Sequence, residues 1–277
     1  MTPNLVIHAV SVSQNVWERR EYKYLIPESK IEGIRAAAQS VCRLDSFAGP
    51  DGSYAIRSLY FDNLQNGLYW ANEREQPDRY KVRVRSYPES QTAPVFLEVK
   101  RRVLDVIVKS RVGLPMERWA EVVSRPDGVL LHDWKAGTQI HAERFLSLVH
   151  GNHLAPRVIV EYRREAYVSV VDDYARLTFD RAVTCQLQDK LDMSVDERQW
   201  RVVDHPVRTQ TFEPVCILEL KFGAVAPPWM VSLVRRFNLL RFSFSKYCYS
   251  LEAQYYLPED RVPTWGRRPR LAGMFER

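Results

Sequence analysis

The sequence is poor in cysteine, and its cysteines form no recognisable pattern. None belongs to a Cys-x-x-Cys pair, and none has a histidine nearby at ligand spacing. This argues against a zinc site and against a disulfide scaffold. Unpaired thiols are typical of reducing compartments, so the expected location is the cytoplasm. The four residues are Cys42, Cys185, Cys216 and Cys248.

Long hydrophobic runs are missing too. No stretch approaches the roughly 18 apolar residues that a membrane-spanning helix needs. The N-terminus contains a short apolar patch but neither a basic leader nor a small-residue cleavage site, so no signal peptide is expected. The absence of internal repeats argues against a solenoid. A membrane-protein partner stays an open alternative.

Positive charge exceeds negative charge. The chain has 277 residues, of which 45% are apolar, enough for one large domain or two small ones. Its formal net charge is +6, which favours a polyanionic partner such as a phosphate, a nucleotide or a nucleic acid. No nucleic acid is expected, because there is no recognition-helix pattern and no RNA-binding signature.

The most informative stretch is residues 79–87, which read RYKVRVRSY. Cations fall on every second residue, and this strict alternation predicts a β-strand with all of them on one face. The cations on such a face repel one another unless an anion lies between them. The simpler alternative is a solvated edge strand. The cations are Arg79, Lys81, Arg83 and Arg85.

Charged residues two positions apart recur on five predicted strands. The positions between them are largely apolar, so the opposite face needs a cover that amphipathic helices can supply. Three of the five pairs read Glu-x-Lys. The pairs are Glu21/Lys23, Arg83/Arg85, Glu98/Lys100, Lys109/Arg111 and Glu219/Lys221.

Many strands joined mostly by turns, with helices interspersed, predict an α+β fold. We expect an antiparallel sheet or barrel with helices packed outside, since the regular alternation of a parallel sheet is missing. Strands are predicted at residues 17–26, 55–62, 79–87, 95–102, 105–112, 156–170, 177–179 and 215–222. Helices are predicted at residues 29–41, 63–74, 115–124, 138–151, 227–238 and 244–256.

The charged faces line either the outside of an open sheet or the inside of a closed one. A dry interior cannot hold about ten cations, because each unpaired buried ion costs several kcal/mol against a total stability of roughly 5–15 kcal/mol. A closed sheet would therefore enclose water and anions, and phosphate suits arginine and lysine. Carboxylates at Glu21, Glu98 and Glu219 indicate Mg²⁺ or Mn²⁺ beside the phosphate. The alternative is that each pairs with a neighbouring cation.

Nine short motifs follow one another in the order of a known family. They are EYKY around Lys23, YFDN at 60–63, RVRSY at 83–87, LEVK at 97–100, KSR at 109–111, YRREAY at 162–167, RLTFD at 176–180, LELK at 218–221 and SKY at 245–247. With them the chain resembles the VTC domain, the polyphosphate polymerase module of the vacuolar transporter chaperone complex. That domain belongs to the triphosphate tunnel metalloenzyme (CYTH-like) superfamily.

The resemblance implies an antiparallel β-barrel tunnel that binds nucleoside triphosphate and polyphosphate. The alternation alone does not decide whether Arg163 or Arg164 is the phosphate ligand, since the two face opposite ways. The family pattern selects Arg164. The implied phosphate ligands are Lys23, Arg83, Arg85, Lys100, Lys109, Arg111, Arg164, Arg176 and Lys246, to which the charge pattern adds Lys81 and Lys221. Those expected to act in catalysis are Lys23, Arg83, Arg85, Lys109, Arg164 and Lys246. Glu219 is the implied metal ligand, with Glu21 and Glu98 as further candidates.

The implied reaction is transfer of the ATP γ-phosphate to orthophosphate or a growing polyphosphate chain, with Mn²⁺ or Mg²⁺. Hydrolytic relatives open with Glu-x-Glu-x-Lys, and here Arg19 replaces the first glutamate, which favours transfer. The alternatives are a metal-dependent triphosphatase or polyphosphatase and a non-catalytic polyphosphate-binding module. The domain is expected at 17–257, between an N-terminal extension (1–16) and a basic C-terminal tail (258–277).

Overall fold

The computed structural model describes residues 20–104, 106–172, 174–209 and 211–255. The predicted extension and the predicted basic tail lie outside the described residues, as does Arg19. The predicted domain limits therefore stay a prediction.

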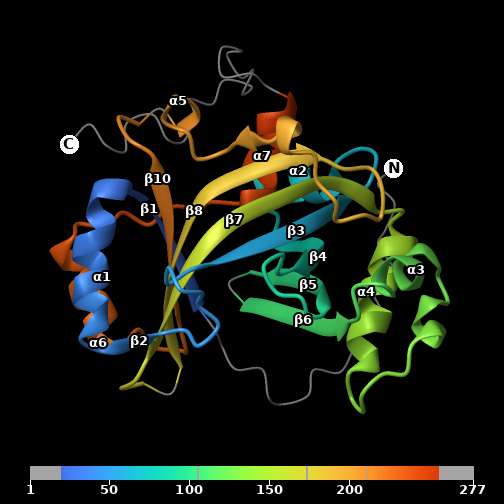
Figure 1. Ribbon diagram of the computed structural model, residues 1–277, viewed down its shortest axis with the longest axis horizontal. Coiled ribbons are helices and arrows are strands. Elements are labelled where there is room, and N and C mark those ends of the chain that lie inside the picture. The colour runs from blue at the N-terminus through green and yellow to red at the C-terminus, as the bar shows by residue number, and fades with distance from the viewer. Residues whose placement is uncertain (1–19, 105, 173, 210, 256–277) are drawn as a thin grey trace.

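One antiparallel sheet of ten strands forms the centre of the molecule (Figure 1). Eight strands follow one path in the order β1-β10-β8-β7-β3-β4-β5-β6, while β2 pairs with β7 and β9 pairs with β8. The strands are β1 Arg20–Pro27, β2 Cys42–Leu44, β3 Tyr54–Asp62, β4 Asp78–Ser86, β5 Val95–Val103, β6 Val106–Leu114, β7 Ala155–Ser169, β8 Ala175–Leu187, β9 Arg201–Val202 and β10 Val215–Phe222.

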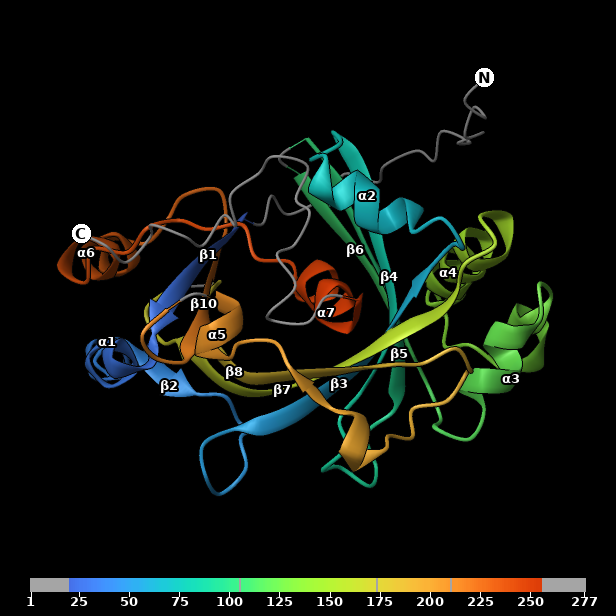
Figure 2. The ribbon, with the colours of Figure 1, turned by 90° about the horizontal axis from the view of Figure 1, so that it is seen from above.

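The sheet bends into a trough, with β1 and β6 on its opposite sides (Figure 2). Register shifts beside Tyr60 in β3 and beside Glu161 in β7 mark irregularities of the kind that bend strands. Within the described residues β1 and β6 do not pair with each other, so the expectation of a closed barrel is wrong. The α+β class and the antiparallel pairing are confirmed. Alternation predicts which side chains share a face, but it carries no signal for pairing between the two outermost strands.

Helices cover the two ends of the convex face (Figure 1). At one end, α1 (Ile31–Gln39) and α6 (Pro228–Arg236) share an apolar core with the outward side chains of β1, β8 and β10. At the other end, α3 (Trp119–Ser124) and α4 (Gln139–Gly151) share one with β4, β5 and β6.

The helix α7 (Lys246–Tyr255) lies within the trough, so the expectation that helices pack outside is wrong for it (Figure 2). Its Tyr247 and Leu251 belong to the same buried core as Val160 and Cys185 of the sheet. The middle of β7 is buried on both faces, so the sequence does not indicate which face this helix covers. Its first residue, Lys246, is thereby carried into the trough.

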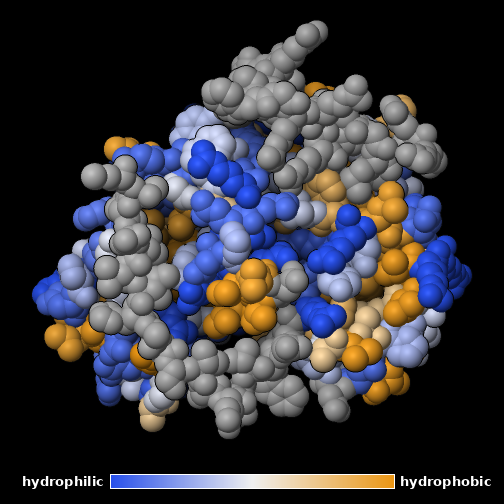
Figure 3. Space-filling model, turned by 180° about the vertical axis from the view of Figure 1, so that it is seen from behind, coloured by the Kyte–Doolittle hydropathy of each residue, from blue (hydrophilic) through white to orange (hydrophobic). Residues whose placement is uncertain are grey.

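Most predicted elements are present with shifted ends. The strand predicted at 177–179 is the much longer β8, and the helix predicted at 63–74 is the shorter α2 (Gly67–Glu73). The strands β2 and β9 and the helix α5 (Pro206–Thr209) were not predicted. None of the helices in the described ranges is long and apolar enough to cross a membrane. On the face opposite to that in Figure 1, hydrophilic residues occupy much of the middle and hydrophobic residues gather in separate groups (Figure 3).

Candidate functional site

The side chains that face into the trough include those that the alternation predicts to be charged. Lys23 of β1 lies opposite Glu219 of β10, and Arg83 of β4 lies opposite Glu98 of β5. Glu98 in turn lies opposite Arg111 of β6. Because opposite residues in a sheet share a face, both walls of the trough project cations and carboxylates into the same space.

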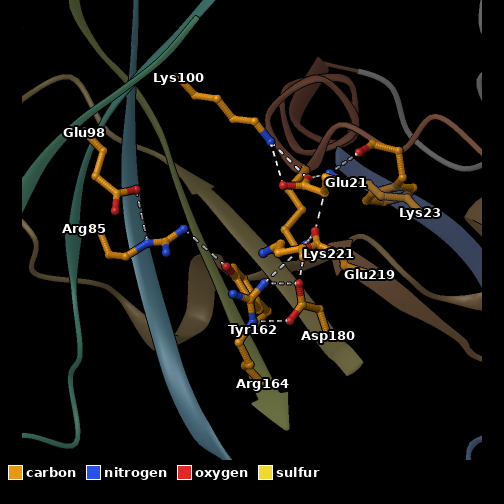
Figure 4. Close-up of polar contacts among 12 residues, drawn as sticks. Glu21, Lys23, Arg85, Glu98, Lys100, Tyr162, Arg164, Asp180, Glu219 and Lys221 are labelled. Atoms are coloured by element: carbon orange, nitrogen blue, oxygen red, sulfur yellow. Dashed lines mark hydrogen bonds and ion pairs between the residues drawn. The ribbon is translucent and has the colours of Figure 1, made fainter. Parts of the chain in front are cut away.

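Glu219 is surrounded by cations from three strands and one helix (Figure 4). Its carboxylate lies 3.0 Å from the ammonium of Lys221 and 3.3 Å from that of Lys246. The ammonium of Lys23 and Nη2 of Arg164 each lie 3.4 Å away. Four of the predicted phosphate ligands therefore meet at one predicted metal ligand.

Asp180 of β8 was not predicted as a site residue, yet it anchors two of these cations. It is fully buried and accepts two hydrogen bonds from the Arg164 guanidinium, each 2.6 Å long. It also accepts one from the Lys246 ammonium at 2.5 Å. The available signal was the alternation in β8, where Asp180 is the second inward position after Arg176.

One ion pair crosses the trough from β5 to β1. The Lys100 ammonium of β5 donates to both carboxylate oxygens of Glu21 on β1, each at 3.0 Å (Figure 4). This contact joins the two walls through side chains, although the edge strands do not pair within the described residues.

Glu98 is the centre of a second cationic cluster, on the wall opposite to Glu219. Nη2 of Arg83 lies 2.7 Å from its carboxylate, and the Lys109 ammonium lies 3.0 Å away. Nε of Arg111 and Nε of Arg85 are more distant, at 3.3 and 3.7 Å. Both of these Nε atoms are buried and make no hydrogen bond to the described residues. Buried donors of this kind require a partner, and a ligand or water oxygen would supply one.

The surrounding cations keep the carboxylates ionised. Burial by itself would raise the pKa of Glu219, but Lys221, Lys246, Lys23 and Arg164 together lower it well below its ordinary value. The pKa values of Glu98 and Glu21 are lowered against burial for the same reason, chiefly by Arg85 and by Lys100 respectively. These three carboxylates therefore stay ionised at neutral pH.

Lys81 differs from the other predicted cations of the site. It lies opposite Lys100, which lies opposite Lys109, so three lysines form a row across β4, β5 and β6. Lys81 makes no ion pair with any residue that the structure describes. Burial, with a smaller contribution from the like charges of Lys23 and Lys100, lowers its pKa to about 7. A lysine without a counter-ion among lysines is suited to bind an anion.

Three predicted ligands, Lys81, Lys100 and Arg176, belong to neither cluster. Arg176 is exposed on β8, opposite Lys221. Tyr162 of β7 was not predicted; its hydroxyl accepts a long hydrogen bond from Nη2 of Arg85 at 3.5 Å. Its ring also lies 4.7 Å from the Lys246 ammonium, so it contacts cations of both clusters.

The three predicted metal ligands form no ready-made metal cage. Within the described parts of the chain, no three histidine, cysteine or acidic side chains are grouped so as to hold an ion. The carboxylates of Glu219 and Glu21 are oxygen donors of the kind that Mg²⁺ and Mn²⁺ prefer. Mg²⁺ is commonly held by one or two carboxylates together with substrate phosphates. The donors thus fit an ion that binds together with a phosphate ligand.

A family model described as the VTC domain matches residues 18–255. None of the curated proteins matches the chain significantly.

Several solved structures are similar to this chain. One is a candidate adenylate cyclase from Bacillus halodurans, with 11% sequence identity and a TM-score of 0.46 over 82% of this chain and 95% of that one. The PH1819 protein of Pyrococcus horikoshii OT3 has 11% identity and a TM-score of 0.41 over 84% and 97%. A candidate adenylate cyclase from Vibrio parahaemolyticus has 10% identity and a TM-score of 0.44 over 84% and 97%.

Proposed function

The chain belongs to the VTC domain family, and from this membership we propose that its trough binds ATP and transfers the terminal phosphate to a polyphosphate end or to orthophosphate. The family is part of the triphosphate tunnel superfamily, whose members transfer or hydrolyse phosphoryl groups. The proposal concerns which of these reactions this chain performs and which residues perform it.

The observation that carries the proposal is that ten cations and four carboxylates face into one trough, where every one of the cations except Lys81 lies beside a carboxylate. The cations are Lys23, Lys81, Arg83, Arg85, Lys100, Lys109, Arg111, Arg164, Lys221 and Lys246, and the carboxylates are Glu21, Glu98, Asp180 and Glu219. Positive charge remains in excess after every carboxylate is paired. A linear chain of phosphates is a polyanion of a shape that can lie along such a trough and neutralise the excess.

In the proposed reaction, a terminal oxygen of the acceptor phosphate attacks the γ-phosphorus of ATP in line. The bond between that phosphorus and the β–γ bridging oxygen breaks, and ADP leaves with the electron pair. The transferring group develops no new covalent bond to the protein, so catalysis consists of positioning and charge stabilisation. Arg164, fixed by Asp180, and Lys246 are placed to bind the phosphate oxygens from one wall, and Arg83, Arg85 and Lys109 from the other.

Mg²⁺ or Mn²⁺, when bound, would neutralise further phosphate charge, with Glu219 as its first protein ligand and Glu21 as a second candidate. Glu98, the third predicted metal ligand, lies on the opposite wall. Its carboxylate is engaged by Arg83 and Lys109 at 3.0 Å or less, with Arg85 and Arg111 close by.

The test is to incubate the purified chain with ATP and Mn²⁺ and to separate the products by length. Polyphosphate together with ADP is the expected result. Orthophosphate without any polymer would contradict transfer and would indicate the triphosphatase alternative. Binding of polyphosphate without any turnover would indicate a binding module.

A further inference from the structure

The inner face of the wall formed by β3, β4 and β5 changes from charged to aromatic toward one end. On β4 the inward positions Lys81, Arg83 and Arg85 are followed by Tyr87, just after the strand ends. On β5, Phe96 lies opposite Arg85. On β3, Tyr54 lies opposite Arg164 of β7. We call Tyr54, Tyr87 and Phe96 the ring cluster.

The rings of this cluster contact one another without being fully buried. The centroids of Tyr54 and Tyr87 lie 6.1 Å apart, and those of Tyr87 and Phe96 lie 6.1 Å apart with their planes at 88°. All three residues are partly exposed. Phe96 lies opposite Gly113 of β6, which places no side chain beside it. Ring surface is thus available to a ligand at this end of the trough.

Arg111 joins the ring cluster to the Glu98 cluster. Its guanidinium carbon lies 3.5 Å from the centroid of the Phe96 ring, and its Nη2 donates to the Tyr87 hydroxyl at 3.3 Å. The same guanidinium lies 3.3 Å from the Glu98 carboxylate through Nε, which is buried and makes no hydrogen bond to the described residues. One side chain therefore contacts both the aromatic surface and the predicted phosphate site.

We infer that the ring cluster, with Arg111, is the platform on which the base of a bound nucleoside triphosphate stacks. Any base offers a flat π surface to aromatic rings and to a guanidinium. The phosphates would then run from the ring cluster toward the row of Lys81, Lys100 and Lys109. Phe96 and Lys100 are separated along β5 by about 13 Å, a length suited to a ribose and a triphosphate.

This inference rests on the proposed function and adds to it the orientation of the bound nucleotide along the trough. The base would lie at the aromatic end, so the γ-phosphate would point toward the lysine row. The acceptor phosphate would then approach from the lysine end of the trough. A ligand without a base, such as tripolyphosphate, would use the same cations but make no use of the rings.

The experiment compares ATP with tripolyphosphate by titration calorimetry, without divalent metal so that no turnover follows binding. Phe96→Leu keeps the apolar bulk and removes the ring. It is expected to weaken ATP binding about tenfold, the effect of losing one stacked base, and to leave tripolyphosphate binding within about twofold. Tyr80→Leu is the matched control, because it removes a ring that contacts an arginine on the convex face, and ATP binding should stay within about twofold of the parent protein. Tyr54→Leu provides a second ring deletion should Phe96→Leu not fold, and it carries the same expectation.

Each other outcome overturns the inference. Equal weakening of both ligands by the ring deletions would show that the rings only support the phosphate site, and the proposed function would stand. If the parent protein binds tripolyphosphate but not ATP, both the platform and the proposed transfer from ATP are overturned, and only an anion-binding trough remains. Failure of the parent protein to bind either ligand would overturn the platform and the proposed function together.

Discussion

At the scale of single residues, the site consists of carboxylates that are outnumbered by the cations around them. Glu219 has four cations within 3.4 Å, and Glu98 has two within 3.0 Å and two more within 3.7 Å. Removing one cation would weaken a bound anion. Removing one carboxylate should strengthen the binding of an anion, although it destabilises the folded chain and, at Glu219, removes a proposed metal ligand.

Glu219→Gln separates these effects. We expect the free energy of unfolding without ligand to fall by about 3 kcal/mol, because four cations lose a buried counter-charge. Tripolyphosphate without metal should bind at least as tightly as to the parent protein and should recover part of the lost stability. Metal-dependent turnover should fall on the order of 10²–10³-fold, by analogy with the loss of one charge-stabilising group.

Thermal unfolding with and without tripolyphosphate, together with product analysis, measures these quantities. Glu161→Gln is the matched control, since Glu161 pairs with Arg57 at 2.6 Å on the convex face and should affect stability alone. Weaker metal-free binding of tripolyphosphate to Glu219→Gln than to the parent protein would contradict the electrostatic account.

Lys81 gives a prediction in the neutral pH range. Its pKa is lowered from 10.5 to about 7 in the folded chain, chiefly by burial. Between these two values the unfolded chain binds more protons than the folded chain at this residue, so its contribution to the free energy of unfolding rises as the pH rises from about 7 to about 10.5. Burial also lowers the pKa of Lys109 to about 7, so Lys81→Met should reduce the measured rise in the free energy of unfolding without abolishing it. Denaturant unfolding at several pH values measures this change.

The same residue should take up a proton when an anion binds. A phosphate oxygen beside the Lys81 ammonium raises its pKa, so calorimetry of tripolyphosphate binding near pH 7.5 in buffers of different ionisation enthalpy should report proton uptake. Lys81→Met should reduce this uptake. Lys221→Met is the control, because the pKa of Lys221 is raised and it stays protonated through this range. Unchanged uptake in Lys81→Met would place the anion elsewhere.

At the scale of elements, α7 is held in the trough by phenol–carboxylate hydrogen bonds at two of its turns. Tyr247 donates to Asp62 at 2.6 Å, and Tyr69 of α2 donates to Glu252 at 2.9 Å. Asp62 also accepts hydrogen bonds from the backbone N–H groups of Leu68 and Tyr69, which open α2. The position of Lys246 thus depends on contacts made by its neighbour, Tyr247.

Tyr247→Phe removes one of these hydrogen bonds and leaves the ring that stacks on Tyr60. We expect a loss of about 2 kcal/mol in the free energy of unfolding, since a hydrogen bond to a buried carboxylate is lost. The amides of α7 should exchange faster with deuterium than in the parent protein. Tyr167→Phe removes a comparable bond to Glu165 on the convex face and should leave α7 exchange unchanged. Equal α7 exchange in both variants would show that Tyr247 does not hold the helix.

At the scale of the whole molecule, the sequence predicts the charged lining well and the closure of the sheet poorly. Alternation at Arg83, Arg85 and Lys109 is a local property, and the register confirms that these side chains share the inner face. Closure and the place of α7 depend on bulges and on long-range packing, which leave little trace in a local pattern. Asp180 was not predicted as a site residue, because the strand predicted there covers only residues 177–179, while β8 has thirteen residues and includes Asp180.

The two walls of the trough act as one site only if a ligand bridges them. The Lys100–Glu21 pair is the direct link between β5 and β1, and it would be exchanged for contacts to phosphate when a polyanion enters. The sheet places one cationic cluster on each wall, so a bridging polyanion would contact both. The location of a bound triphosphate is therefore the central question.

A crystal structure of the chain soaked with tripolyphosphate answers it most directly. The account predicts one tripolyphosphate in the trough, with oxygens within hydrogen-bond distance of Arg164 and Lys246 on one wall and of Arg83 or Arg85 on the other. Tripolyphosphate bound only on the convex face or at one wall, with the Lys100–Glu21 pair intact, would contradict it.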